Sequence, residues 1–387
     1  MKNAIVIIPT YNEAETIQRT VQAVLAIFDK ITDWKMGILV VDDTSPDKTY
    51  VVVEALRKND SRVHLLINKQ KAGLGTAYLK GMEHAFDALK ADVVFEFDAD
   101  LSHDPAKIPL FLKSIERGND LVLGSRYIKG GSIPADWGLH RKFLSKMGNL
   151  VIMCVLTNFK IKDWTSGYRA LTEKVFRAVS PRLRSERFSG YTFQIGFLYH
   201  ALKLGFKVDT NIPYHFSDRT VGESKIGPEY IKNTLSFILR VRIKEILAMK
   251  VIKFATVGGI GALVQLSTLY FWRMIAPYEL ATFLSIECAV ISNFILNNLW
   301  TFADQKLHFS VIPKKFIQFN LASFGSIFIQ YVIALGGKYT IGIHPLFTIF
   351  GLVTIDTGML YAVVGILVGM VLNFFAYSRF VWKSAKK

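Results

Sequence analysis

Short apolar runs alternate with amphipathic stretches over roughly the first third of the chain, a pattern typical of α/β proteins. A stretch with helical periodicity follows the first apolar run, and Asn12 is its expected N-cap. Because strands that alternate with helices form parallel βαβ units, we predict a mostly parallel sheet with helices on both faces. The expected strands are Ala4–Ile8, Gly37–Val41, Val63–Ile67, Val93–Phe97 and Leu121–Gly124, and the expected helices are Ala14–Phe28, Tyr50–Arg57 and Gly75–Leu89.

Two later segments mix basic with apolar residues, as helices on an anionic membrane surface do. They are Trp137–Asn158 and Tyr230–Lys250. The alternative is that each segment is an ordinary amphipathic helix that covers the sheet. Candidate membrane spans follow these segments in the chain, and this favours a position on the membrane surface.

The last part of the chain contains four candidate membrane spans, each with the roughly 20 apolar residues that crossing a bilayer requires. The spans are Phe254–Met274, Leu280–Trp300, Phe316–Leu335 and Leu346–Tyr377, the last interrupted by Asp356. Similar pairs of residues open the first and third spans, which indicates a duplicated helical hairpin. We therefore expect an α/β domain at 1–229, an interfacial helix at 230–250 and a four-helix membrane domain at 251–387.

The charge balance favours anionic partners. Lys and Arg number 47 against 31 Asp and Glu, a formal net charge of +16, which suits nucleic acid, an anionic membrane or phosphorylated substrates. Basic residues cluster after the second span and at the C-terminus, so the positive-inside rule predicts that both ends are cytoplasmic. The two cysteines, Cys154 and Cys288, lie far apart in apolar runs, which argues against a disulfide framework.

Acidic residues follow the expected strands at the edge where ligands bind in parallel sheets. Asp98 and Asp100 come directly after a buried strand. Two carboxylates there are costly unless a positive partner satisfies them. A Mg²⁺ or Mn²⁺ ion that bridges a diphosphate would do so; a solvated turn is the alternative, in which His103 would be a structural loop residue.

A second acidic cluster, Asp42–Asp47, follows the second strand. Carboxylates at this place can accept hydrogen bonds from ribose hydroxyls. Helix capping would explain Asp47 alone, but not the adjacent pair Asp42 and Asp43. In the membrane part, Glu287 is costly within a span and is therefore a candidate functional residue.

Several short motifs occur in a fixed order over about the first 230 residues. They are Ile8–Glu13, Val41–Asp47, Gly73–Gly75, Asp98–His103, Gly124–Tyr127, Thr165–Arg169, Gly190–Gln194, Arg219 and Gly222–Lys225. This ordered set resembles the family 2 glycosyltransferases with the GT-A fold, and within them the dolichol-phosphate mannose synthases. The membrane half is similar to the GtrA-like four-helix domain.

The resemblance implies a role for each matched position. Ser102 stands where many relatives carry Gln, and Ser189 and Gly196 replace a Lys and a Glu that relatives often have. Nucleotide-sugar contacts are implied for Pro9, Tyr11, Glu13, Val40, Asp42, Asp98, Ala99, Asp100, Arg126, Arg219 and Lys225; metal binding for Asp98, Asp100 and Ser102; catalysis for Asp100, Arg126, Arg219 and Gln194; and lipid-phosphate binding for Arg141 and Ser145.

The implied reaction is the inverting transfer of a hexose, mannose first, from GDP-mannose to dolichyl or polyprenyl phosphate, with Mg²⁺ or Mn²⁺ and without a nucleic acid partner. A phosphate monoester is already ionised near neutral pH, since its second pKa is about 6, so the acceptor needs positioning more than a general base. Two alternatives stay open: transfer of glucose from UDP-glucose to polyprenyl phosphate, and a non-enzymatic protein that binds or flips a lipid-linked sugar. A dinucleotide-binding oxidoreductase is disfavoured because Gly73 and Gly75 lack the third glycine of that motif.

Overall fold

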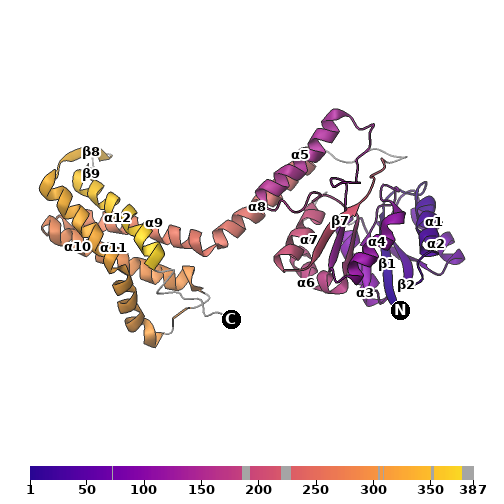
Figure 1. The fold of residues 1–387 in the computed structure, drawn as a ribbon, viewed down its shortest axis with the longest axis horizontal. Coiled ribbons are helices and arrows are strands. Elements are labelled where there is room, and N and C mark those ends of the chain that lie inside the picture. Colours follow the sequence, from indigo (N-terminus) through magenta and orange to yellow (C-terminus); the bar gives the residue numbers. More distant parts are fainter. Residues whose placement is uncertain are drawn as a thin grey trace. The chain divides into compact units, whose positions relative to one another are not determined.

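The protein divides into two compact units, Met1–Arg242 and Ile243–Lys387, in this computed structural model (Figure 1). The structure describes residues 1–71, 73–184, 192–218, 228–303, 306–307, 309–349 and 353–376.

A seven-stranded sheet forms the centre of the first unit, with the order β3-β2-β1-β4-β6-β5-β7. Strand β6 runs antiparallel to β4 and β5, whereas every other neighbouring pair is parallel. The predicted mostly parallel α/β sheet is therefore confirmed, and β6 and β7 are additions to it. The strands are β1 (Lys2–Thr10), β2 (Trp34–Asp42), β3 (Val63–Ile67), β4 (Val93–Glu96), β5 (Leu121–Ser125), β6 (Arg169–Thr172) and β7 (Val208–Pro213).

Helices cover both faces of the sheet, because successive strand residues point to opposite sides. Val6 and Ile8 pack in one apolar core with α1, α2 and α4, and Ile5 and Ile7 pack in another with α3, α5, α6, α7 and α8. The helices are α1 (Ile17–Phe28), α2 (Thr49–Asn59), α3 (Leu74–Asp87), α4 (Ile108–Glu116, after a 3₁₀ turn at Pro105–Lys107), α5 (Leu139–Val155), α6 (Glu173–Arg184), α7 (Thr192–Lys203) and α8 (Pro228–Ala248).

The predicted N-cap of the first helix is wrong. Helix α1 begins at Ile17 after Thr16, and Asn12 adopts a left-handed conformation with φ 59°. The Asn12 backbone N–H donates to Ser45 Oγ at 3.1 Å. A partner distant in sequence therefore holds Asn12 in a loop.

The second unit consists of four long helices in its described part: α9 (Lys250–Trp272), α10 (Tyr278–Leu296), α11 (Ile312–Thr340) and α12 (Thr357–Ala376). Among the described residues, Ile252–Trp272 and Tyr278–Thr301 are long and apolar enough to cross a membrane. A third span results if the pair Phe309–Leu321 and Ser323–Thr340, bent by 49°, counts as one.

The predicted fourth span, Leu346–Tyr377, is wrong in its first part. Strands β8 (Pro345–Ile349) and β9 (Val353–Asp356) pair antiparallel there, and the helix begins only at Thr357. The β-branched residues of β9 favour extended structure but raise hydropathy as helical residues do. Tyr377 lies outside the described residues.

One charged pair is buried in the core beneath the end of β4. Glu96 lies opposite Arg169 in the register of β4 and β6, and both residues are fully buried. Arg169 donates to the backbone oxygens of Ser166 at 2.8 Å and Gln194 at 2.7 Å, whereas neither carboxylate oxygen of Glu96 accepts a hydrogen bond from a described residue. Burial raises the pKa of Glu96 to about 7, and the charge of Arg169 offsets this only in part.

We predict that Glu96→Gln removes a pH dependence of stability. Between the usual Glu pKa of 4.5 and about 7, the unfolded chain has released a proton that the folded chain keeps, so the free energy of unfolding falls as the pH rises through this window. In metal-free buffer at about pH 8 the variant should be more stable than the wild type by on the order of 3 kcal/mol, and at about pH 4, below both pKa values, the difference should nearly vanish. Thermal unfolding of both proteins at the two pH values measures this; an equal difference in Tm at both would contradict it.

Candidate active site

The acidic loops of the sequence meet at one edge of the sheet. Strands β2, β1 and β4 are neighbours, and all three run parallel. Their carboxyl ends therefore carry the loops Pro9–Glu13, Asp42–Asp47 and Asp98–Asp104 side by side, which is the arrangement that the sequence predicted. Ligands of parallel sheets bind at this edge.

Hydrogen bonds join the first two loops. The carboxylate of Asp42 is fully buried and accepts from Thr10 Oγ1 at 3.0 Å and from Ser45 Oγ at 2.6 Å. Asp47 accepts from the backbone N–H groups of Ala14 and Thr49, both at 3.0 Å. Burial opposes the charge of Asp47, but these bonds and that of the Thr49 hydroxyl together lower its pKa. Both carboxylates thus fix the loop conformation.

Four non-glycine residues in these loops or directly beside them have positive φ angles. They are Asn12, Thr44, Lys48 and Leu101, with φ between 59° and 61°. Such conformations cost about 1 kcal/mol or more each and gather at functional sites. The hydrogen bonds between the loops hold Asn12 and its neighbours in place against this strain.

Asp98, Asp100 and Ser102 present a set of oxygen atoms at the end of β4. The Asp98 side chain is one-third exposed, and Asp100, which is 7% exposed, accepts from the Ser102 backbone N–H at 3.1 Å. The Ser102 hydroxyl is buried and has no hydrogen-bond partner among the described residues. Two carboxylates and a hydroxyl suit a hard cation such as Mg²⁺, whose remaining ligands are commonly phosphate oxygens and water. The described residues include no cluster of three or more His, Cys, Asp or Glu side chains that could bind a metal alone.

His103 orients Asp98, a role that the sequence did not reveal. Its Nδ1 accepts from the Asp98 backbone N–H at 3.1 Å, and its Nε2 lies 3.5 Å from Asp98 Oδ2. The ring stacks on Tyr168 with centroids 4.8 Å apart. Burial lowers the pKa of His103 despite the nearby carboxylates. The neutral imidazole therefore fixes Asp98 through its backbone N–H.

Arg126 forms a buried pair with Asp163 that ties the end of β5 to the loop before β6. Its Nε and Nη2 donate to the two carboxylate oxygens at 2.8 and 2.7 Å, and Nη2 also donates to Thr165 Oγ1 at 2.8 Å. Burial opposes the charge, but Asp163 keeps the pKa of Arg126 well above its usual value. All three of these hydrogen bonds involve Nε or Nη2 of the guanidinium, and none of them involves Nη1. Asp163 therefore orders this loop by binding Arg126.

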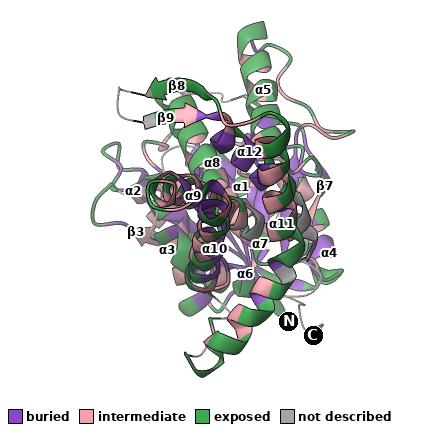
Figure 2. Ribbon diagram, turned by 90° about the vertical axis from the view of Figure 1, so that its left-hand side faces the viewer, coloured by how far each residue is buried: buried purple, intermediate pink, exposed green. Residues whose placement is uncertain are grey.

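Helix α5 carries the two residues predicted to bind the lipid phosphate. Arg141 donates to Asp218 at 3.0 Å and lies 3.8 Å from the centre of the Trp137 ring. Ser145 shares a hydrogen bond of 2.5 Å with the Tyr127 hydroxyl, and Tyr127 follows Arg126. Figure 2 shows α5 largely in the colour of exposed residues. Its exposed apolar side chains are Leu139, Phe143, Leu144, Met147, Leu150 and Val151.

The remaining predicted residues lie in different surroundings. Gln194 is buried, and its Oε1 has no partner among the described residues. Tyr11 lies 3.7 Å below the Lys71 ammonium. Val40 is wholly buried in the core with α1 and α2, so its side chain does not reach the edge. Arg219, Lys225 and Ser189 lie outside the described residues.

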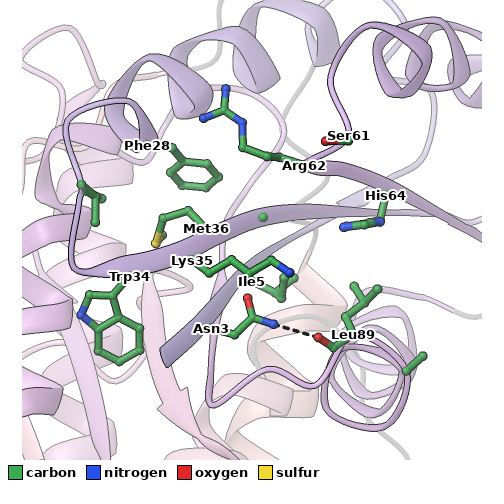
Figure 3. A pocket seen from close by; sticks show the side chains of 13 residues that line it. Asn3, Ile5, Phe28, Trp34, Lys35, Met36, Ser61, Arg62, His64 and Leu89 are labelled. Carbon is green, nitrogen blue, oxygen red and sulfur yellow. Dashed lines mark hydrogen bonds between the residues drawn. The ribbon is translucent and has the colours of Figure 1, made fainter. Parts of the chain in front are cut away.

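A separate pocket of about 500 Å³ lies at the opposite end of the strands (Figure 3). Trp34 and Lys35, at the start of β2, line it together with Arg62 and His64. The Arg62 guanidinium is bound to Asp29 and Asp60 at 2.7 and 2.8 Å. The pocket contains none of the predicted site residues, so the acidic edge remains the candidate active site.

Comparison with known proteins confirms the family predicted for each half of the chain. The family model "Glycosyl transferase family 2" matches residues 5–179, and "GtrA/DPMS, transmembrane domain" matches residues 253–382. Dolichol-phosphate mannosyltransferase of Pyrococcus furiosus is 30% identical over 85% of this chain and 88% of its own length. Polyprenol monophosphomannose synthase of Mycolicibacterium smegmatis is 36% identical over 60% of this chain and 84% of its own.

Among solved structures, glucosyl-3-phosphoglycerate synthase from Mycobacterium tuberculosis, in complex with Mn²⁺, UDP and glucosyl-3-phosphoglycerate, matches with a TM-score of 0.46. It is 16% identical and aligns with 62% of this chain and 79% of its own. The match to the Pyrococcus furiosus mannosyltransferase spans 334 residues and so extends beyond the first unit into the membrane part. The chain therefore belongs to the family 2 glycosyltransferases of the dolichol-phosphate mannosyltransferase type and carries a C-terminal GtrA/DPMS transmembrane domain.

Proposed function

We propose that the protein transfers mannose from GDP-mannose to a polyprenyl phosphate such as dolichyl phosphate, with inversion at the anomeric carbon. The observation that carries this proposal is the oxygen-lined edge at Asp98, Asp100 and Ser102, on a chain that also has a membrane domain. The oxygen-lined edge suits the cation and diphosphate of a nucleotide sugar, and the membrane domain brings the enzyme to a lipid acceptor. The relatives' names supply mannose and the polyprenyl carrier.

The donor lies across the carboxyl ends of β1, β2 and β4 in this proposal. The nucleoside contacts Pro9, Tyr11 and Glu13, whose loop the buried carboxylate of Asp42 fixes through Thr10. Asp98, Asp100 and Ser102 would hold Mg²⁺ or Mn²⁺, and the bound cation would neutralise charge that develops on the leaving diphosphate.

The chain's own residues position the reacting groups around that edge. The Tyr78 hydroxyl donates to the Asp98 carboxylate, and His103 accepts from the Asp98 backbone N–H. Arg126 supports the phosphate side of the donor, and Gln194 lies near the sugar in this proposal. Arg219 and Lys225 complete the phosphate contacts in this proposal.

The acceptor phosphate is ionised near neutral pH and attacks once it is held in line with the leaving group. Arg141 and Ser145 are the proposed clamp for this phosphate. The exposed apolar side chains of α5 alternate with the basic residues Lys142 and Lys146. A helix of this composition suits an anionic bilayer surface. The basic loop after the second span supports a cytoplasmic position for this unit and for both ends of the chain.

We predict that Asp100→Asn lowers mannosyl transfer by about a hundredfold or more, since it removes one of the two carboxylates that would hold the cation at the leaving diphosphate. The matched control is Asp104→Asn in the same loop, because Asp104 caps the short 3₁₀ turn through the Ala106 N–H at 2.9 Å and lies outside the oxygen set. Transfer of radiolabel to dolichyl phosphate by the full-length protein measures both. Equal activity of Asp100→Asn and the wild type in Mn²⁺ would refute the site.

A second prediction separates a phosphate clamp from general attraction to the membrane. Arg141→Ala should raise the KM for polyprenyl phosphate by about tenfold and leave the KM for the nucleotide sugar unchanged, because a bound phosphate loses its charge-assisted partner. Lys146→Ala, an exposed cation on the same helix, is the control. Steady-state kinetics in liposomes gives both KM values. If the two substitutions raise the KM for polyprenyl phosphate equally, Arg141 contributes only general attraction to the membrane and the clamp is refuted.

A further inference from the structure

The membrane unit contains a small cavity that has several polar side chains in its lining and that the proposed transfer reaction does not use. It has a volume of about 60 Å³ and lies between α9, α10, α11 and α12. Its polar lining consists of Gln265, Asn293, Asn297, Ser323, Ser326 and Gln330.

Three of these residues place buried acceptor atoms in the interior of the unit without a partner. Asn293 Oδ1, Asn297 Oδ1 and Gln330 Oε1 accept no hydrogen bond from any residue that the structure describes. A bilayer supplies no water to its core, so unpaired polar groups are even more costly there than in a soluble protein. Three such atoms around one cavity indicate a ligand that donates hydrogen bonds.

Glycines make room for these polar groups. A Cβ atom at Gly261 of α9 would overlap the amide of Asn293, and one at Gly369 of α12 would overlap the Ser326 hydroxyl and the Gln330 amide. Larger residues at either position would fill this space with hydrocarbon. The backbones therefore approach closely where the amides lie.

The backbone of the second span is irregular at the same place. Asn297–Thr301 forms a π-helical turn, and the Phe302 N–H donates to the Asn297 oxygen at 2.8 Å. Single π-turns often mark functional positions within helices. Irregular backbone at membrane depth is tolerated where protein buries it or water lines it.

The lining decides the chemical class of the ligand. It includes no Asp, Glu, Lys, Arg or His side chain among the described residues, so an ion would lack a counter-charge. The volume is far below the roughly 300 Å³ of a typical ligand pocket, and it equals about two water molecules at ~30 Å³ each.

We infer that this cavity is a hydrated site, in which water donates hydrogen bonds to Asn293, Asn297 and Gln330 inside the membrane domain. Water here satisfies the amide oxygens and keeps the glycine-lined helices in register. Any other occupant would have to be a small uncharged hydroxyl group. The site is independent of the proposed transfer reaction.

Thiol reactivity tests this inference, because a cysteine reacts as its thiolate, which forms in water and is disfavoured in hydrocarbon. In a background with Cys154→Ser and Cys288→Ala, Ser326→Cys places a thiol in the cavity with almost no change in shape. Gly325→Cys is the matched control at the same membrane depth, since Gly325 is exposed on the outer face and a Cβ there meets nothing within 4 Å. Methyl methanethiosulfonate, a small uncharged reagent, is added to the full chain in liposomes, and mass spectrometry follows the modification.

The hydrated site predicts that Ser326→Cys reacts at least about tenfold faster than Gly325→Cys. It also predicts that Asn293→Leu, a substitution of similar size, lowers Tm, because an apolar group displaces bound water; in a dry cavity the loss of an unpaired amide would raise Tm. Gel filtration and Tm of each cysteine variant confirm folding. An unreactive Ser326→Cys, an equally reactive Gly325→Cys, or a higher Tm for Asn293→Leu each overturns the inference.

Discussion

The end of strand β4 sets the constraint on which the catalytic unit depends. It delivers two carboxylates, Asp98 and Asp100, to an edge that is largely buried, where negative charge is costly unless it is neutralised or hydrogen-bonded. Two hydrogen bonds reach these carboxylates: the Tyr78 hydroxyl donates to Asp98 at 3.4 Å, and the Ser102 backbone N–H donates to Asp100 at 3.1 Å. His103 and Thr20 fix the backbone of the same loop through the Asp98 N–H and the Ala99 oxygen. An oxygen set held this firmly is preorganised for a cation and a diphosphate.

The same principle explains the rest of the edge. Buried charges occur with partners that fix a loop, as in the pairing of Asp42 with Thr10 and of Arg126 with Asp163. Glu96 is the exception, since it faces Arg169 without a direct hydrogen bond and carries a raised pKa. A reaction centre on this sheet therefore rests on loops whose conformations are determined by buried polar contacts, with strain at residues such as Leu101.

The sequence predicted the parts of the fold that depend on local pattern. Apolar runs ended by polar residues identified the parallel strands, and the ordered motifs identified the family, which the comparisons confirm. Strand β6 was missed because it has four residues and begins with the charged Arg169, which only its buried partner explains. The hairpin before α12 was misread because apolar β-branched residues raise hydropathy in strands and helices alike.

The candidate site was predictable to the same extent. Acidic residues at strand ends converge because parallel neighbours share an edge, and this followed from the order of elements. The contacts of His103 and the pairing of Arg126 with Asp163 join residues that are distant in sequence or ambiguous in type, so no local pattern contained them. A charged residue within an apolar strand, as at Glu96, was the one signal that could have pointed to the buried pair.

The central claim is that this chain moves mannose onto a lipid phosphate, and donor choice tests it most directly. The purified full-length protein is given dolichyl phosphate with radiolabelled GDP-mannose or UDP-glucose, each with Mn²⁺ or with a chelator, and label in the lipid fraction is counted. The account predicts labelled lipid from GDP-mannose that disappears with the chelator. Labelling from UDP-glucose alone, or none from either donor while GDP-mannose still binds, would contradict it.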